Sequence, residues 1–223
     1  MNSIKTLLIN RYKTFALLSL SMAFSIVLLM IRIKLAHSFF FSFLVWNLFL
    51  ALIPYVISTY LTGSTNLNKI EIVVWFLIWL LFLPNAPYIV TDLLHLKVSS
   101  HHRLWLDVLV VSAFALNGLL IFFISLTDME DIINRYMNKK QTNYFIMCLL
   151  FLCSFGVYLG RFLRYNSWEL IQNPTELLND VFEITCNPNA HLEAWVFTLI
   201  FGVFLNLGYW VFKQLFEKPN SFV

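Results

Sequence analysis

The chain is poor in charged residues, in cysteine and in clustered basic sequence. Only 12% of its 223 residues are charged, whereas an average soluble domain has roughly 25%. Three cysteines give no disulfide framework. The 15 Lys and Arg residues are scattered, which argues against a nucleic-acid-binding face. Since 60% of the residues are hydrophobic, one small core cannot bury them, and a membrane is the predicted solvent.

Long apolar runs take up most of the sequence, and about 20 apolar residues suffice for one helix to cross a bilayer. We predict an all-α, integral membrane bundle of about six transmembrane helices in a single domain covering residues 1–223. The predicted spans are Thr14–Ala36, Phe39–Leu61, Ile70–Pro84, Leu104–Leu126, Asn143–Leu163 and Ala194–Phe212. Arg32 and Lys34 follow the first run in place of a small-residue cleavage site, which favours an uncleaved span over a signal peptide.

The third span is the weakest of the six, because its uninterrupted part, Ile72–Leu83, is short. Pro84 and Pro87 follow, and proline removes a backbone donor and disfavours helix. We therefore expect Pro84–Val90 to be an irregular segment that packs against protein or lines a cavity, since bare lipid cannot satisfy its backbone. The Asn85 amide should find a hydrogen-bond partner there.

The orientation follows from the Lys and Arg residues near the ends of the spans. With both termini in the cytoplasm, Pro84–Arg103 and Arg164–Leu192 lie outside. The inner side then carries nine basic residues, namely Lys5, Arg11, Lys13, Lys69, Arg135, Lys139, Lys140, Lys213 and Lys218. The outer side carries six, namely Arg32, Lys34, Lys97, Arg103, Arg161 and Arg164. This excess favours cytoplasmic termini.

The last outer segment contains a helix-start signal. Asn173, Pro174 and Glu176 match an N-cap, a proline at the first helical position and an acid at the third. The apolar residues that follow recur at helical spacing with polar residues opposite. We predict a short amphipathic helix on the membrane surface or on the outer end of the bundle.

The first polar motif, PNAPYIVTDLLHL, contains Asp92 and His95 three residues apart. If this piece is helical the two side chains converge, and a carboxylate can then orient an imidazole for proton transfer. An interfacial turn with its polar residues in water is the alternative. Asp107 lies one turn inside the fourth span, and a carboxylate there needs a partner. Arg161 or Arg103 is the expected one.

The second motif, GRFLRYNSWELIQNP, contains Arg161 and Arg164, which share a face if helix continues that far. Two guanidinium groups suit a phosphate or carboxylate. Anchors at the membrane boundary, paired with acids, are the alternative. Asn166 and Glu169 complete the motif as candidate substrate-binding residues, with Asn85 from the first motif. We expect at least one of these arginines within about 4 Å of Asp92 or Asp107.

These motifs, FLPNAPYIVTDLLHL, WLDVLVVSAFALNGLLIF and GVYLGRFLRYNSWELIQNP, resemble a bacterial multi-pass membrane family known as domain of unknown function 1361. The resemblance covers roughly Ile70 to Phe212. Tyr165 stands where the family typically has Trp. The resemblance implies a bacterial inner membrane and supplies no reaction, substrate or cofactor.

Three functions are open on the sequence. In the first, an outward-facing polar pocket binds or processes an anionic lipid or lipid-linked phosphate, with Arg161 and Arg164 as anion ligands and Asp92, His95 and Asp107 as catalytic groups. In the second, the protein is a non-catalytic membrane scaffold, and the same charges form a structural ion-pair cluster. A small transporter is the third, although only one span is visibly broken. The spacing of His and Cys predicts no metal site, and the cofactor and protein partners are unknown.

Overall fold

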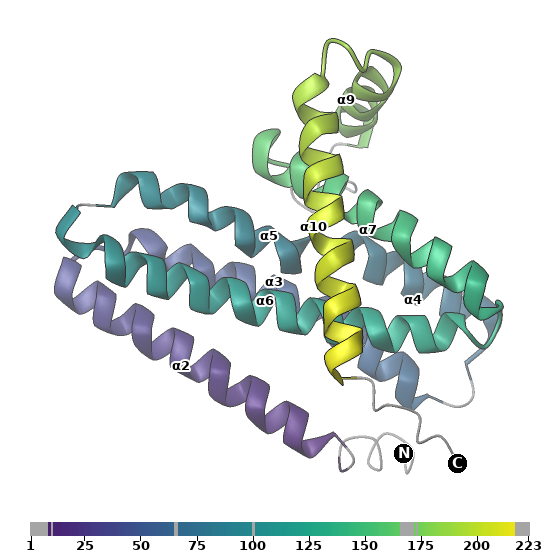
Figure 1. Ribbon diagram of the computed structural model, residues 1–223, viewed down its shortest axis with the longest axis horizontal. Coiled ribbons are helices and arrows are strands. Elements are labelled where there is room, and N and C mark those ends of the chain that lie inside the picture. The colour runs from purple at the N-terminus through teal and green to yellow at the C-terminus, as the bar shows by residue number, and fades with distance from the viewer. Residues whose placement is uncertain are drawn as a thin grey trace. The chain divides into compact units, whose positions relative to one another are not determined.

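The computed structural model describes residues 9, 11–64, 67–99, 101–165, 172 and 174–216. This described part of the chain is helical and contains no strand (Figure 1). The chain divides into two compact units, Met1–Ile133 and Asn134–Val223, called unit 1 and unit 2 below. The single domain predicted from the sequence stays a prediction.

The predicted all-α membrane architecture is confirmed. Among the described residues, six helical segments are long and apolar enough to cross a bilayer. The helices in these segments are α2 (Tyr12–Ala36), η1 (Phe40–Ser42) with α3 (Phe43–Gly63), α4 (Lys69–Phe82) with the shorter helices that follow it as far as Lys97, α6 (Leu104–Ile133), α7 (Lys139–Phe162) and α10 (Leu192–Phe216). The fourth segment continues to Ile133 rather than ending at Leu126, which brings further acidic residues into the helix.

Two helices begin at reciprocal caps that the sequence encodes. The Asn68 side chain accepts from the backbone of the third residue of α4, and the Glu71 carboxylate accepts from the Asn68 N–H at 3.1 Å. Asn138 and Gln141 repeat this arrangement at the start of α7, with bonds of 2.9 and 3.4 Å. Each cap satisfies backbone donors that would otherwise lack partners in the first turn.

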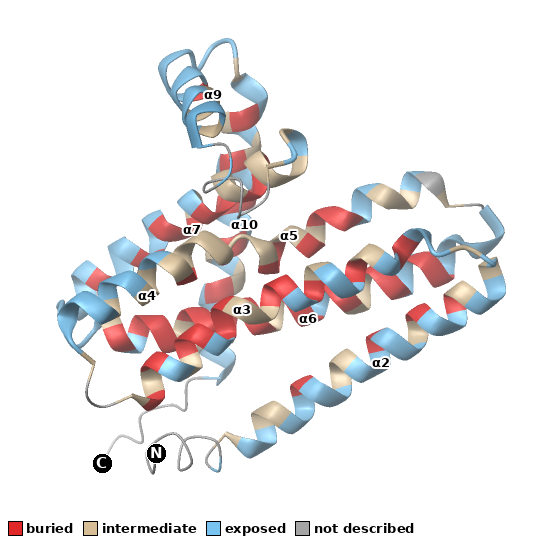
Figure 2. Ribbon diagram, turned by 180° about the vertical axis from the view of Figure 1, so that it is seen from behind, coloured by how far each residue is buried: buried red, intermediate tan, exposed pale blue. Residues whose placement is uncertain are grey.

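Unit 1 is organised around α6, which packs against α2, α3 and α5. Buried residues run along the length of this helix (Figure 2). Phe114, Ile121 and Phe122 are among the fully buried side chains. In contrast, α2 keeps many apolar side chains exposed, including Leu17, Leu20 and others that a surrounding lipid would cover. The polar residues of α6 are therefore held by neighbouring helices.

The chain breaks at Pro84, as the prolines predict, but the segment after it is not irregular. Helix α4 ends at Phe82, and α5 (Asn85–Thr91) follows after a two-residue turn. Pro87 is the third residue of α5, where the first-turn N–H has no helical partner, so proline is tolerated. The expectation of irregular backbone was wrong for this reason.

The expected packing of this segment is confirmed, because α5 lies against α6. Ala86, Pro87 and Ile89 are buried. At Gly118 of α6, a Cβ atom would lie 2.6 Å from the carbonyl oxygen of Ala86. Glycine thus permits an approach of the two backbones that any side chain would obstruct.

In unit 2, α7 packs against α10, with Gly202 of α10 against the ring of Phe151. The predicted amphipathic helix is confirmed as α9 (Pro174–Cys186), and it begins at the predicted proline. Its Ile184 is buried against Tyr158 of α7 and Ala194 of α10. The other apolar edge of α9, including Phe182, is exposed.

Candidate functional site

Asp92 lies at the end of unit 1 formed by the C-terminal end of α2, the start of α3, the short helix η2 (Asp92–Val98) and the start of α6. We call this the Asp92 end. The Asp92 side chain is fully buried, and the Asn47 amide donates to its Oδ2 at 2.9 Å. A buried carboxylate needs such donors because it has left water. Asn47 belongs to α3, so this bond also ties η2 to α3.

His95 converges on Asp92, as the three-residue spacing predicts. In a 3₁₀ helix such as η2, residues three apart lie on one side. His95 Nε2 is 3.9 Å from Asp92 Oδ1, and the His95 side chain is 37% exposed. The rings of Phe40 and Phe43 meet the imidazole edge to face, at centroid distances of 6.0 and 5.1 Å. The imidazole is therefore held between a buried carboxylate and the surface.

Asp107 has a different partner from the expected Arg161 or Arg103. The Arg32 Nε of α2 donates to Asp107 Oδ1 at 2.9 Å, and both residues are buried. Arg32 also donates to the carbonyl of Ser38 at 2.8 Å and lies over the Phe41 ring at 4.7 Å. Arg32 and Asp107 therefore form an ion pair that is shielded from solvent within unit 1.

The exposed ionisable residues of the η2–α6 connection are basic. Residues 93–106 contain no Asp or Glu. The basic rim, as we call it, consists of Lys97, His101, His102 and Arg103, all exposed. Arg103 also donates to the carbonyl of Leu35 at the end of α2, at 3.2 Å. The connection between the buried Asp92 and the buried Asp107 thus exposes basic side chains and no acidic ones.

The amide of Asn85 donates to the carbonyl of Phe82 at 2.9 Å. The expected hydrogen bond of Asn85 to protein is confirmed. Its position, just after the last residues of α4, shows what the bond does: it satisfies a carbonyl freed by the break in the helix. The predicted role of Asn85 in substrate binding stays a prediction.

The second motif lies in unit 2, and its two arginines do not share a helix face. Helix α7 ends at Phe162, and Arg164 has a left-handed φ of 65°. After this turn the Tyr165 N–H bonds back to the carbonyl of Leu159 at 3.2 Å. Arg161 is half-buried and Arg164 is exposed. The predicted shared face was wrong, because it required the helix to continue past Phe162.

The aromatic side chain after this turn ties the motif to α9. The Tyr165 hydroxyl donates to Asp180 Oδ2 at 2.7 Å. Asn166 and Glu169 lie outside the described residues. The expected meeting of the arginine motif with Asp92 or Asp107 joins residues of different units, and it stays a prediction.

The described residues contain no group of three or more His, Cys, Asp or Glu side chains placed to hold a metal ion. A family model described as "Protein of unknown function (DUF1361)" matches residues 46–207, most of the chain. The chain belongs to the DUF1361 family. No curated protein and no solved structure matches it. Together with six apolar helices, membership of DUF1361 describes a multi-pass membrane protein in a family without a known function.

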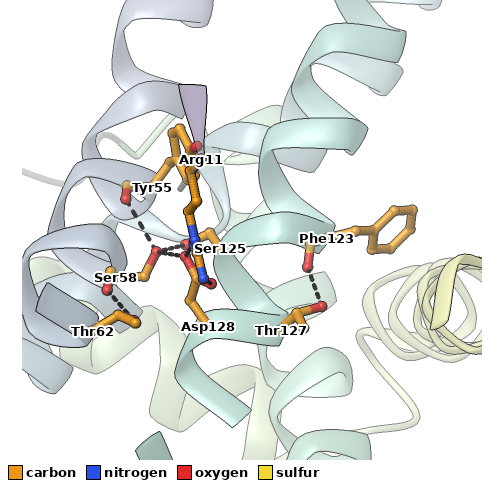
Figure 3. Close-up of polar contacts among 8 residues, drawn as sticks. All are labelled: Arg11, Tyr55, Ser58, Thr62, Phe123, Ser125, Thr127 and Asp128. Atoms are coloured by element: carbon orange, nitrogen blue, oxygen red, sulfur yellow. Dashed lines mark hydrogen bonds and ion pairs between the residues drawn. The ribbon is translucent and has the colours of Figure 1, made fainter. Parts of the chain in front are cut away.

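A second ion pair, absent from our sequence-based predictions, lies at the opposite end of unit 1. Asp128 of α6 is buried and accepts two bonds from Arg11, at 2.6 and 2.7 Å (Figure 3). The bond to Asp128 raises the pKa of the Arg11 guanidinium. This region is called the Asp128 end below. The predicted fourth span stopped at Leu126 and so left Asp128 in a loop.

The two ion pairs belong to one helix–helix contact. Arg11, directly before α2, lies 21 residues from Arg32, and Asp107 and Asp128 are 21 residues apart in α6. The two helices therefore run antiparallel, and a separation of three heptads keeps each pair of like charges on one face of a gently supercoiled helix. This spacing was the signal in the sequence. Helix α2 lies before the region matched to DUF1361, whereas its acidic partners lie inside it.

Between the ion pairs, Asn117 of α6 donates to the Ser25 hydroxyl of α2 at 2.9 Å. Both side chains are buried. An asparagine in the middle of a span thus joins two helices by a hydrogen bond at this position. The α2–α6 contact thus has a polar group at each end and one in the middle.

Proposed function

We propose that the protein binds the phosphate of an anionic lipid or lipid-linked substrate at the Asp92 end and processes it there, with Asp92 and His95 as an acid–base pair. The observation that carries this proposal is the arrangement of a fully buried Asp92 beside a half-exposed His95, 3.9 Å away. A carboxylate beside an imidazole fixes its orientation and stabilises its protonated form. In the proposed mechanism, the partly exposed imidazole transfers a proton to or from the bound ligand.

The basic rim supports an anionic ligand. Lys97 and Arg103 carry exposed positive charge in the connection that follows His95, and this connection contains no acidic residue. An anionic head group would therefore meet an attractive potential as it approached His95. The aromatic rings of Phe40 and Phe43 provide apolar surface beside the imidazole. This combination suits a lipid, whose charged and apolar parts are adjoining.

We place the Asp92 end outside a bacterial inner membrane, with both termini cytoplasmic. The excess of basic residues near the opposite ends of the spans supports this orientation. The inner side keeps this excess when the two arginines in ion pairs, Arg11 and Arg32, are left out, because each side then loses one basic residue. Cysteines introduced at Ser99 and Asn138 test it. Ser99 should react with an impermeant thiol reagent in intact cells, and Asn138 only after permeabilisation; the reverse pattern would invert the orientation.

The proposed chemistry is tested in a strain that lacks the gene, by mass spectrometry of lipids and small metabolites against the parent. Wild-type protein should reverse the difference between the strains. D92N and H95Q should fail to do so while expression and membrane insertion are normal, because general acid–base groups contribute about 10²- to 10⁴-fold in rate. H191Q is the matched control, since His191 lies in unit 2 beside Glu183. Full reversal by H95Q would refute the proposal.

A non-catalytic membrane scaffold is the second candidate, and the two Arg–Asp pairs of α2 and α6 favour it. They close both ends of one helix contact with paired charges. If the protein is only a scaffold, D92N and H95Q should reverse the strain difference in proportion to the amount of folded protein. Arg161, the expected anion ligand of the second motif, is tested in the same way with R161Q.

A further inference from the structure

Helix α9 is attached to unit 2 where two membrane-spanning helices have a common end (Figure 1). Its buried Ile184 packs against Tyr158, one turn before the end of α7, and against Ala194 in the first turn of α10. The Trp195 Nε1 of α10 also donates to the carbonyl of Ile184 at 3.2 Å. The ends of helices that cross a bilayer lie at its boundary. The same depth is therefore expected for α9.

Hydrogen bonds on two sides hold α9 at this place. Residues 187–191 alone connect it to α10, and the Asn187 N–H at their start donates to the carbonyl of Glu183 at 2.9 Å. On the other side, the Tyr165 hydroxyl that follows α7 donates to Asp180 Oδ2 at 2.7 Å. Together with the buried Ile184, these bonds fix one face of α9 against the rest of unit 2.

Another edge of α9 leaves apolar side chains uncovered by protein. Leu178 and Phe182 are 58% and 69% exposed, and a separation of four residues puts them on one side of the helix. We call these two residues the apolar edge. Asn179 and Glu183, which directly follow them in the sequence, are also exposed and lie about 100° further round the helix. At a membrane boundary, such an edge can be buried between lipid head groups.

The charge of this region selects the kind of lipid. Residues 174–193 contain the acids Glu176, Asp180, Glu183 and Glu193 and no lysine or arginine. Surface helices that bind anionic lipids carry Lys and Arg on their polar face, whereas acidic residues are repelled by an anionic surface. Lipids whose head groups have no net charge therefore fit α9 best.

We infer that the apolar edge of α9 is buried in the interfacial layer of the bilayer, among lipids whose head groups carry no net charge. This inference depends neither on the proposed reaction nor on which leaflet α9 meets. It gives α9 a role in positioning the second motif. Through the bond from Tyr165 to Asp180, a helix anchored in lipid holds the left-handed turn at Arg164 near the head groups.

The test places spin labels on α9 of the full-length protein in phosphatidylcholine nanodiscs. The exposed Cys148 and Cys186 are first replaced in C148A/C186S, whereas the buried Cys153 is kept because the label does not reach it. Single cysteines are then introduced at the apolar edge and at the adjacent polar positions, as L178C, F182C, N179C and E183C. All four positions are exposed, so the changes should not affect folding. Power-saturation EPR then measures how often each label collides with oxygen, which concentrates in lipid, and with a water-soluble nickel chelate.

The labels of L178C and F182C should collide with oxygen more often than with the chelate, at a depth of about 5–10 Å in the interfacial layer. N179C and E183C are the matched controls and should collide mainly with the chelate. Adding phosphatidylglycerol should not deepen the apolar edge. Equal chelate collisions at all four positions would place the edge in water and overturn the inference. Low access of both reagents to L178C and F182C would show a protein cover, such as a second copy, and would also overturn it. Immersion that requires phosphatidylglycerol would overturn the choice of lipid.

Discussion

The two ends of unit 1 hold the same kind of ion pair in different surroundings. At the Asp92 end, Arg32 is buried, bonds Asp107 and a backbone carbonyl, and lies over an aromatic ring. At the Asp128 end, Arg11 is partly exposed and joins a carboxylate that the Ser58 hydroxyl also contacts. The guanidinium of Arg32 is therefore shielded from solvent at its ion pair, whereas the side chain of Arg11 remains 27% exposed at its own.

The distance between the two pairs also has a physical meaning. Twenty-one residues of α-helix span about 31 Å, since each residue adds about 1.5 Å. The hydrocarbon core of a bilayer is about 30 Å thick. The pairs Arg32–Asp107 and Arg11–Asp128 therefore have the separation of the two membrane boundaries. The charges of the α2–α6 contact therefore lie at the membrane boundaries, where a charge costs less free energy than in the hydrocarbon core. The Asn117–Ser25 hydrogen bond lies between the two ion pairs.

The largest expected difference between the two ends is in the stability lost when the arginine of each ion pair is replaced. R32Q should lower the free energy of unfolding by about 3–5 kcal/mol, because it leaves Asp107 as an uncompensated buried charge. R11Q should cost less, since water reaches its side chain, which is 27% exposed. Reversible unfolding in detergent, monitored by tryptophan fluorescence, measures both. In the double variant R32Q/D107N, part of the loss should be recovered, because both buried charges are gone.

An R11Q variant that loses as much stability as R32Q would break the comparison. It would mean that the two pairs have the same structural function. The matched controls are D107N and D128N. Each removes one negative charge from its ion pair and keeps the size of the side chain.

The next largest effect is expected at the close contact between α5 and α6. G118A should destabilise unit 1 by about 1–3 kcal/mol, the usual cost of overpacking. Its new Cβ would lie 2.6 Å from the backbone oxygen of Ala86, which cannot move without shifting α5. G202A in unit 2 is the matched control. There the obstacle is the ring of Phe151, a side chain that can rotate, so the cost should be smaller. A larger loss for G202A would contradict this explanation.

Local features of the fold were predictable, whereas the pairing of charges was not. Apolar runs gave six spans, the Asn173–Pro174 signal gave the start of α9, and the spacing of Asp92 and His95 gave their convergence. The choice of Arg32 rather than Arg103 or Arg161 for Asp107 depends on how α2 lies against α6, which is a long-range property. The end of α7 was also unpredictable, because the left-handed position after it is held by Arg164 rather than by a glycine or an asparagine.

The middle of the α2–α6 contact should contribute less than its ends. N117A removes the bond to Ser25 and should cost about 1 kcal/mol, in the range of interhelical hydrogen bonds in membranes. N206A is the matched control, since Asn206 donates at 2.8 Å to the Gly202 carbonyl of its own helix. That bond links no two helices, so its loss should change the free energy of unfolding less. Equal costs would show that side-chain packing, rather than the bond between helices, explains the effect.

The smallest effect has the opposite sign and compares the two units. Arg164 and His37 both have left-handed backbone, with φ of 65° and 50° at the ends of α7 and α2. This conformation costs an ordinary residue about 1–2 kcal/mol, whereas glycine adopts it freely but loses more entropy on folding. R164G and H37G should therefore each stabilise the protein by up to about 1 kcal/mol in the same unfolding measurement. If Arg164 binds an anion, R164G should also weaken binding of inorganic phosphate, measured by calorimetry, although the protein is more stable. A gain in stability with unchanged phosphate binding would show that Arg164 only ends the helix.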